Sequence, residues 1–258
     1  MLGKSGLMTQ YCFIVRLTEL VCCFCIIVSS AVSGNCQYSN VQQANNIESL
    51  TIIDREKDEF KLGEIIIPAA FIATGSVLNI KGPDAAKKLI VRERNEYLGQ
   101  FRTYVDDYLQ FSPIILAYGL DVCGVKSKND FINKTAILIK GEAMMFTISH
   151  SLKYATSMTR PDHSNNHSFP SGHTAQAFAA ATFLSMEYKD NYPWIPVVSY
   201  GIASSVGLLR MANNKHYISD VLLGAGIGIL SMQVSYYTHR YKWKSMKKEV
   251  KAECLPSH

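Results

Sequence analysis

The side chains best suited to catalysis lie close together in the sequence, between Arg210 and Asp220. His216 and Asp220 are four residues apart, so they share one face if a helix has begun there. A carboxylate near Nδ1–H fixes the tautomer of an imidazole, leaves Nε2 free as a nucleophile and stabilises the charge that follows attack. Arg210 adds a planar guanidinium that matches phosphate oxygens. Alone, this segment could equally hold an ordinary surface ion pair.

A pair of cations precedes this segment. Lys153 and Arg160 are seven residues apart, two turns of helix, so we expect them on one face of a helix that Pro161 ends. Two positive charges beside apolar surface favour an anionic ligand. Two long cationic side chains at the edge of a membrane would give the same pattern.

Residues 170–173, between these two segments, read Pro-Ser-Gly-His and lead into an apolar stretch, 175–186, that we expect to be helical. Gly172 permits close backbone approach, and the N–H groups of a turn that enters a helix can bind a phosphate. Ser171 adds a hydroxyl donor, and His173 stands where the turn becomes a helix, able to point into the same cavity. A capping turn with a surface histidine is the ordinary alternative.

Together the three segments contain the groups that metal-free phosphoryl transfer requires: a nucleophile, an orienting carboxylate, a general acid and several cations. Their order, Lys-x6-Arg-Pro, Pro-Ser-Gly-His and Arg-x5-His-x3-Asp, strongly resembles the type 2 phosphatidic acid phosphatase superfamily. That superfamily also includes bacterial class A acid phosphatases and vanadium haloperoxidases. The resemblance covers about residues 105 to 238 and implies a histidine phosphatase with no metal and no cofactor.

The resemblance also implies a role for each matching residue. His216 matches the nucleophile that forms a phosphohistidine, Asp220 the carboxylate that orients it, and His173 the acid that protonates the leaving oxygen. The phosphate-binding shell is matched by Lys153, Arg160, Ser171, Gly172 and Arg210. One position departs from the family pattern, because Leu209 stands where a serine usually precedes the arginine of the third motif. A hydroxyl beside Arg210 is therefore missing, although no catalytic group is lost.

Composition limits the kinds of protein that could carry these motifs. The chain has 258 residues, of which 48% are hydrophobic and 18% charged, and its formal net charge is +5. The mean hydropathy is +0.04. These values exclude intrinsic disorder, a collagen-like repeat and a nucleic-acid-binding tail, and they leave a compact membrane protein or an unusually apolar secreted one. The 7 cysteines gather mostly in the N-terminal segment, so they indicate no disulfide framework.

Apolar runs indicate the helices that must position the motifs. The charge-free or mostly charge-free runs are Ile65–Ile80, Tyr108–Leu120, Phe131–Leu152, Thr174–Met186, Asn191–Leu209 and Val221–Thr238. The last two approach the ~18 to 20 residues that a helix needs to cross a bilayer. We therefore expect an all-α fold, a multispan transmembrane bundle of about five or six core helices. The buried helices of a soluble all-helical protein would look similar.

The flanking segments give a domain plan. Residues 1–33 are expected to be a signal peptide or N-terminal anchor, 34–61 a polar linker, 62–240 a membrane-embedded phosphatase domain and 241–258 a basic C-terminal tail. Basic segments favour the cytoplasmic side, so the tail places residues 210–220 outside. In residues 81–104 cations alternate with apolar side chains, which predicts an amphipathic helix on the membrane surface.

These expectations lead to an integral membrane lipid phosphatase, in a bacterial inner membrane with its active site facing the periplasm. The expected partners are the bilayer and a lipid substrate (lipid A, a polyprenyl diphosphate, phosphatidic acid or phosphatidylglycerol phosphate), with no nucleic acid. Three alternatives stay open: a soluble periplasmic acid phosphatase with the same active site, a vanadate-dependent haloperoxidase and a non-catalytic lipid-binding bundle. His163 and His167, with Asp162, could indicate a metal site but more readily fit a solvated loop or contacts to a headgroup.

Overall fold

The computed structural model describes residues 62–80 and 84–239, which form helices and connecting loops with no β-strand. The helices are α2 (Leu62–Ile80), α3 (Asp84–Leu98), α4 (Val105–Leu109), α5 (Ser112–Val122), α6 (Phe131–Thr156), α7 (Gly172–Tyr188), α8 (Ile195–Ala212) and α9 (Ile218–Tyr237). The all-α prediction is confirmed for this part of the chain. The expected leader, linker and basic tail lie outside the described residues.

Helix α7 lies at the centre of the bundle. From Thr174 to Tyr188, every side chain except that of Gln176 is buried. Small residues allow α9 to approach closely: a Cβ on Gly228 would lie 2.2 Å from the carbonyl oxygen of Ala175, so only glycine fits. Helices α5, α6 and α8 also pack against α7, while α2 and α6 pack against α9.

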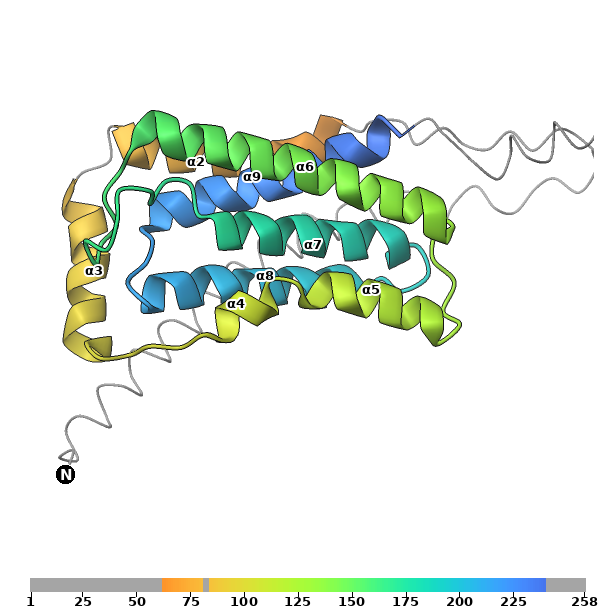
Figure 1. Cartoon of the computed structure of the whole chain (residues 1–258), viewed down its shortest axis with the longest axis horizontal. Coiled ribbons are helices and arrows are strands. Elements are labelled where there is room, and N and C mark those ends of the chain that lie inside the picture. Colours follow the sequence, from red (N-terminus) through yellow and green to blue (C-terminus); the bar gives the residue numbers. More distant parts are fainter. Residues whose placement is uncertain (1–61, 81–83, 240–258) are drawn as a thin grey trace, which may run out of the picture.

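One end of the bundle brings the three sequence motifs together. Figure 1 shows α5, α6 and α7 side by side, with α3 lying across the end of the bundle where α7 begins. At this end α6 and α8 finish and α7 and α9 start, so the loops that carry the motifs meet there. The amphipathic helix expected within 81–104 is α3, and it covers these loops.

Large apolar side chains remain on the outside of the bundle. Along α6, Phe131, Ile139, Phe146 and Tyr154 are 64%, 64%, 58% and 70% exposed. Their spacing of seven or eight residues places them on one face of the helix. By length and composition, α8 and α9 are each long and apolar enough to cross a membrane.

Candidate active site

Lys153 and Arg160 reach the site from different elements, so the prediction that they share a helical face is wrong. Helix α6 ends at Thr156, and Ser157 has a left-handed backbone with φ 44°, which turns the chain away before Arg160. The hydroxyl of Thr156 donates to the carbonyl of Phe169 at 3.1 Å. The helix therefore stops early because the chain after it packs against the second motif.

The second motif forms the expected turn into a helix. Ser171 is the N-cap of α7, and its hydroxyl lies 2.9 Å from the hydroxyl of Thr174. Its backbone N–H donates to the carbonyl of Asp220 at 3.0 Å, which joins the second motif to the third. A Cβ on Gly172 would lie 3.4 Å from Nζ of Lys153, so the lysine ammonium stands directly over the turn.

His216 lies in the loop before α9, which begins at Ile218, so the helix has not begun at this histidine. The imidazole is 2% exposed. Its Nδ1–H donates to the backbone carbonyl of Ser168 at 2.8 Å, and the carboxylate of Asp220 lies 3.5 Å from the same nitrogen. With the proton held on Nδ1, the lone pair of Nε2 is free for attack on phosphorus.

The protonation state of His216 fits a nucleophile. Burial lowers the pKa of its imidazole to about 4, against the opposing effect of Asp220. The positive charges of Arg210 and Arg160 lower this pKa further. His216 is therefore neutral at pH 7, with an unprotonated Nε2.

Three cations from three different elements surround the site. Lys153 comes from α6, Arg160 from the loop that follows it and Arg210 from α8. Burial, and to a smaller extent the positive charge of the neighbouring Arg210, lowers the pKa of the Arg160 guanidinium. Nε of Arg160 and Nε of Arg210 are both buried and have no partner within the described residues. Buried donors without partners are rare in folded proteins, so both guanidinium groups keep an unused capacity to bind an oxyanion.

Two aspartates that the motifs did not reveal complete the site. Nε2–H of His173 donates to the carboxylate of Asp107 at 2.8 Å. Nη1 of Arg210 donates to the carboxylate of Asp106 at 2.6 Å. Both aspartates lie on α4, and their only sequence signal is an adjacent acidic pair at the start of an apolar stretch.

The loop between the first two motifs carries the other histidines. His163 and His167 are exposed, and Asp162 forms an ion pair with Lys215 at 2.6 Å. The ion pair of Asp162 with Lys215 therefore links this loop to the third motif. In the described residues, His163 and His167 belong to no group of three potential metal ligands.

One such group does occur within the described residues, formed by Asp106, Asp107 and His173, whose potential ligand atoms lie within 4.8 Å of one another. The guanidinium of Arg210 is already bound to Asp106 and lies 3.7 Å from Asp107. A positive charge in that position opposes a second cation, so these residues are better understood as a hydrogen-bonded ion-pair network.

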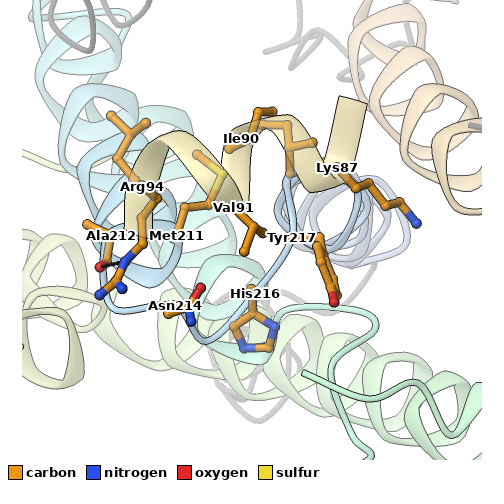
Figure 2. A pocket seen from close by; sticks show the side chains of 11 residues that line it. Lys87, Ile90, Val91, Arg94, Met211, Ala212, Asn214, His216 and Tyr217 are labelled. Atoms are coloured by element: carbon orange, nitrogen blue, oxygen red, sulfur yellow. Dashed lines mark hydrogen bonds between the residues drawn. The ribbon is translucent and has the colours of Figure 1, made fainter. Parts of the chain in front are cut away.

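Helix α3 lies on the side of the His216 loop that faces away from the imidazole ring. A small cavity of about 40 Å³ separates α3 from the loop after α8, and it is lined by His216, Tyr217 and several apolar side chains. Figure 2 shows the His216 ring extending away from α3, and Arg94 of α3 donating to the carbonyl of Ala212. The position of α3 therefore contributes to the burial of His216.

Comparisons with known proteins agree with the motifs. The chain is 37% identical over 140 residues to a lipid A 1-phosphatase of Porphyromonas gingivalis, covering 54% of this chain and 32% of that protein. It is 35% identical over 80 residues to a probable diacylglycerol pyrophosphate phosphatase 1 of Schizosaccharomyces pombe, covering 27% of this chain and 29% of that one. The chain thus spans about a third of the length of these curated relatives.

The crystal structure of LpxE from Aquifex aeolicus is also similar, with 24% identity and a TM-score of 0.45 over 59% of this chain and 95% of that one. The model of the PAP2 superfamily matches residues 135–244, the region that holds all three motifs. This match covers less than half of the chain, and over that region the sequence is similar to the PAP2 superfamily.

Proposed function

We propose that this protein is a lipid phosphatase that removes a terminal phosphate from an anionic membrane lipid without a metal ion. The observation that carries the proposal is the pair of buried, unpartnered Nε–H groups of Arg160 and Arg210 beside a neutral His216. Lys153 adds a third positive charge over the turn at Gly172. Together these groups offer a tetrahedral dianion both a nucleophile and several directed donors.

The proposed reaction has two steps. Nε2 of His216 attacks phosphorus in line with the leaving oxygen, the P–O bond breaks, and His173 gives its proton to that oxygen. Water then attacks the phosphohistidine while His173 takes a proton from it, which breaks the N–P bond and releases phosphate. Asp220 stabilises the positive charge that the imidazole carries between the two steps.

Embedding in a bilayer is the second part of the proposal, with residues 62–240 as the membrane domain. The exposed stripe of α6 from Phe131 to Tyr154 is about 35 Å long, close to the thickness of a bilayer core. Exposed apolar area of this extent suits acyl chains rather than water. A cytoplasmic basic tail after α9 would then place the active-site end at the periplasmic surface of a bacterial inner membrane.

The substrate class follows from chemistry and from relatives. The names of the two curated relatives refer to phosphate groups on lipids, lipid A in one case and diacylglycerol pyrophosphate in the other. We therefore include lipid A, a polyprenyl diphosphate, phosphatidic acid and phosphatidylglycerol phosphate as candidate substrates. Each presents a terminal phosphate at a membrane surface, where the α3 end of the bundle would lie.

A phosphate-release assay tests the function. Full-length protein purified in detergent is given each candidate lipid, with and without a chelator and with vanadate. We expect release that persists in chelator, stops with vanadate and disappears in His216→Ala. His239→Gln, at the far end of α9, is the matched control because glutamine can keep the hydrogen bond to Asn133.

Two results would contradict this proposal. Loss of activity in chelator would remove the metal-free mechanism. Recovery of active protein in the soluble fraction, with no detergent requirement, would favour a soluble acid phosphatase with the same site.

A further inference from the structure

Helix α4 places two adjacent carboxylates against two different motifs. The carboxylate of Asp107 accepts the Nε2–H of His173 at 2.8 Å, and that of Asp106 accepts Nη1 of Arg210 at 2.6 Å. Both aspartates lie outside residues 135–244, the region that the family model matches. The site of this chain is therefore completed by a segment that carries none of the three motifs.

Asp106 fixes the orientation of Arg210. Asp106 is fully buried, and its second oxygen accepts Nδ2–H of Asn213 at 3.0 Å. The guanidinium is thus held at Nη1 while its Nε stays buried without a partner. Because a guanidinium is planar, fixing one edge fixes the direction of the donors on the other edge. Arg210 lacks a serine neighbour at position 209, and Asp106 provides the anchor from another element.

The segment that carries α4 is itself bound to the end of α8. Arg94 is 5% exposed and donates to the carbonyl groups of Ala212 at 2.8 Å and Phe101 at 3.2 Å. Asn213 forms two hydrogen bonds with the backbone of Thr103, each 2.9 Å long. The carboxylates therefore sit on a backbone whose position is set relative to Arg210.

Asp107 determines which nitrogen of His173 can exchange a proton. An ionised carboxylate only accepts hydrogen bonds, so Nε2 keeps its hydrogen and Nδ1 is the ring nitrogen left to exchange a proton. As a general acid, His173 must carry a proton on Nδ1 as well, which makes the ring positively charged. A negative charge in contact with Nε2–H stabilises that form.

Other charges around His173 act against its protonation. Arg210 from α8 lies nearby, and Lys153 from α6 stands over the adjacent Gly172, while Asp106 and Asp107 of α4 supply the negative charge. Burial and Arg210 lower the pKa of His173, and the hydrogen bond that His173 donates to Asp107 opposes this. Without Asp107, the imidazolium form of His173 would have no carboxylate in direct contact.

We propose that Asp107 and Asp106 are positioning residues for phosphoryl transfer: Asp107 holds the proton-donating form of His173, and Asp106 aims Arg210 at the phosphate. This inference rests on the proposed function. In the first step the Nδ1 proton moves to the leaving oxygen as the P–O bond breaks and the bond from Nε2 of His216 to phosphorus forms. In the second step the attacking water returns a proton to Nδ1 as the N–P bond breaks.

A histidine titration tests the role of Asp107 without relying on turnover. The imidazole signals of isotope-labelled full-length protein in detergent are followed with pH by NMR, and His173 is assigned with His173→Gln. In Asp107→Asn, which keeps an oxygen acceptor, the pKa of His173 should fall by about one unit or more. Asp190→Asn, an exposed aspartate just after the other end of α7, should leave it unchanged. An unchanged pKa in folded Asp107→Asn protein overturns the proposal.

Kinetics then separate a role in proton transfer from a structural one. For a lipid phosphate, with a poor leaving group, Asp107→Asn should lower kcat at pH 7 by ~10² or more, and the alkaline limb of the pH profile should move to lower pH. An aryl phosphate needs little protonation of its leaving oxygen, so its loss should stay within about tenfold. Equal losses on both substrates, without a shifted limb, indicate mere structural damage and overturn the proposal.

Asp106→Asn should instead weaken phosphate binding, seen as a rise in KM and in the vanadate inhibition constant of about tenfold. If this variant cannot be purified, Asp106→Glu keeps the charge, moves it by one methylene and gives the same readout. Unchanged vanadate inhibition in either variant contradicts the role of Asp106. Absence of any phosphate release by the wild-type protein would overturn the proposed function, while the titration would still decide on Asp107.

Discussion

The Nδ1–H of His216 donates to the backbone carbonyl of Ser168 at 2.8 Å, while the Asp220 carboxylate stands 3.5 Å from the same nitrogen. Asp220 is held elsewhere: it accepts the Ser168 hydroxyl, the backbone N–H of Tyr217 at 3.0 Å and the hydroxyl of Ser219 at 3.0 Å. The imidazole tautomer is thus set mainly by a peptide carbonyl. The carboxylate adds negative charge 3.5 Å from Nδ1 and caps α9.

This division of roles predicts a moderate effect of Asp220→Asn. Where a carboxylate alone fixes the tautomer, its amide variant loses ~10⁴ in kcat. Here the Ser168 carbonyl keeps Nδ1–H in place, so we expect a loss of no more than ~10². His216→Ala should abolish turnover in the same phosphate-release assay. A folded Asp220→Asn protein that is as inactive as His216→Ala would show that the carbonyl is insufficient.

The low pKa of His216 predicts how stability depends on pH. Its pKa is about 4 in the folded protein and near the ordinary value of 6.5 when unfolded. Between these values the unfolded chain binds more protons, so stability is full above pH 6.5 and falls as the pH drops toward 4. The size of the effect is on the order of 3 kcal/mol, because each pKa unit corresponds to about 1.4 kcal/mol.

Thermal unfolding of detergent-solubilised protein at pH 4 to 7.5 measures this effect. The melting temperature of the wild type should fall more steeply below pH 6.5 than that of His216→Asn, which cannot titrate at this position. Parallel curves for the two proteins would mean that His216 is protonated as easily in the folded state as in the unfolded one.

The helices and the two histidines could be predicted from the sequence, because both depend on local patterns. Apolar runs mark α2, α8 and α9, and the Pro-Ser-Gly-His turn leads into α7 as expected. His173 and His216 both lie near Arg210, whose positive charge lowers the pKa of each imidazole. Short-range periodicity and motif spacing are enough for these features.

The rest depends on contacts that leave no local signal. Asp107 is 66 residues from His173 in sequence, and Asp106 is 104 residues from Arg210. A backbone carbonyl such as that of Ser168 exists at every residue, so no sequence pattern singles it out. The sequence does not reveal that α6 ends before Arg160, because the left-handed conformation at Ser157 depends on packing against the second motif.

Because α7 and α9 pack closely, the effect of replacing a glycine with alanine should depend strongly on which glycine is replaced. A Cβ on Gly228 would lie 2.2 Å from the Ala175 carbonyl oxygen, and one on Gly224 would lie 2.6 Å from that of Ser171. Gly228→Ala should therefore destabilise the protein by ~2 kcal/mol or more. Gly224→Ala should also reduce activity, because it displaces the turn that begins α7.

Gly201→Ala is the matched control in a helix, since its Cβ would meet nothing within 4 Å. Alanine is the better helix former, so this variant should be neutral or stabilised by up to ~1 kcal/mol. Melting temperatures in detergent compare the three variants. Similar melting temperatures for Gly228→Ala and Gly201→Ala would contradict the close approach of the two helices.

The ion pair between Asp162 and Lys215 predicts a weaker, salt-sensitive link between the loops of the first and third motifs. Burial opposes ionisation of Asp162, but the hydrogen bonds from Lys215 and Ser164 and the charge of Lys215 together outweigh it and lower the pKa of the carboxyl to about 2. The pair therefore remains ionised across the range in which a phosphatase would be assayed. Lys215 is partly exposed, so solvent screening limits the energy of the pair to about 1 kcal/mol or less.

Asp162→Asn and Lys215→Gln should each lower kcat/KM by only a few-fold, because Arg160 and His216 are held by other contacts as well. In the double variant the loss of kcat/KM should be smaller than the two single losses combined. The difference between the two gives the coupling energy of the two loops. Raising the salt concentration should reduce the wild-type advantage, since exposed ion pairs are screened. If the losses of kcat/KM add fully, or do not depend on salt concentration, the two side chains act on the site independently.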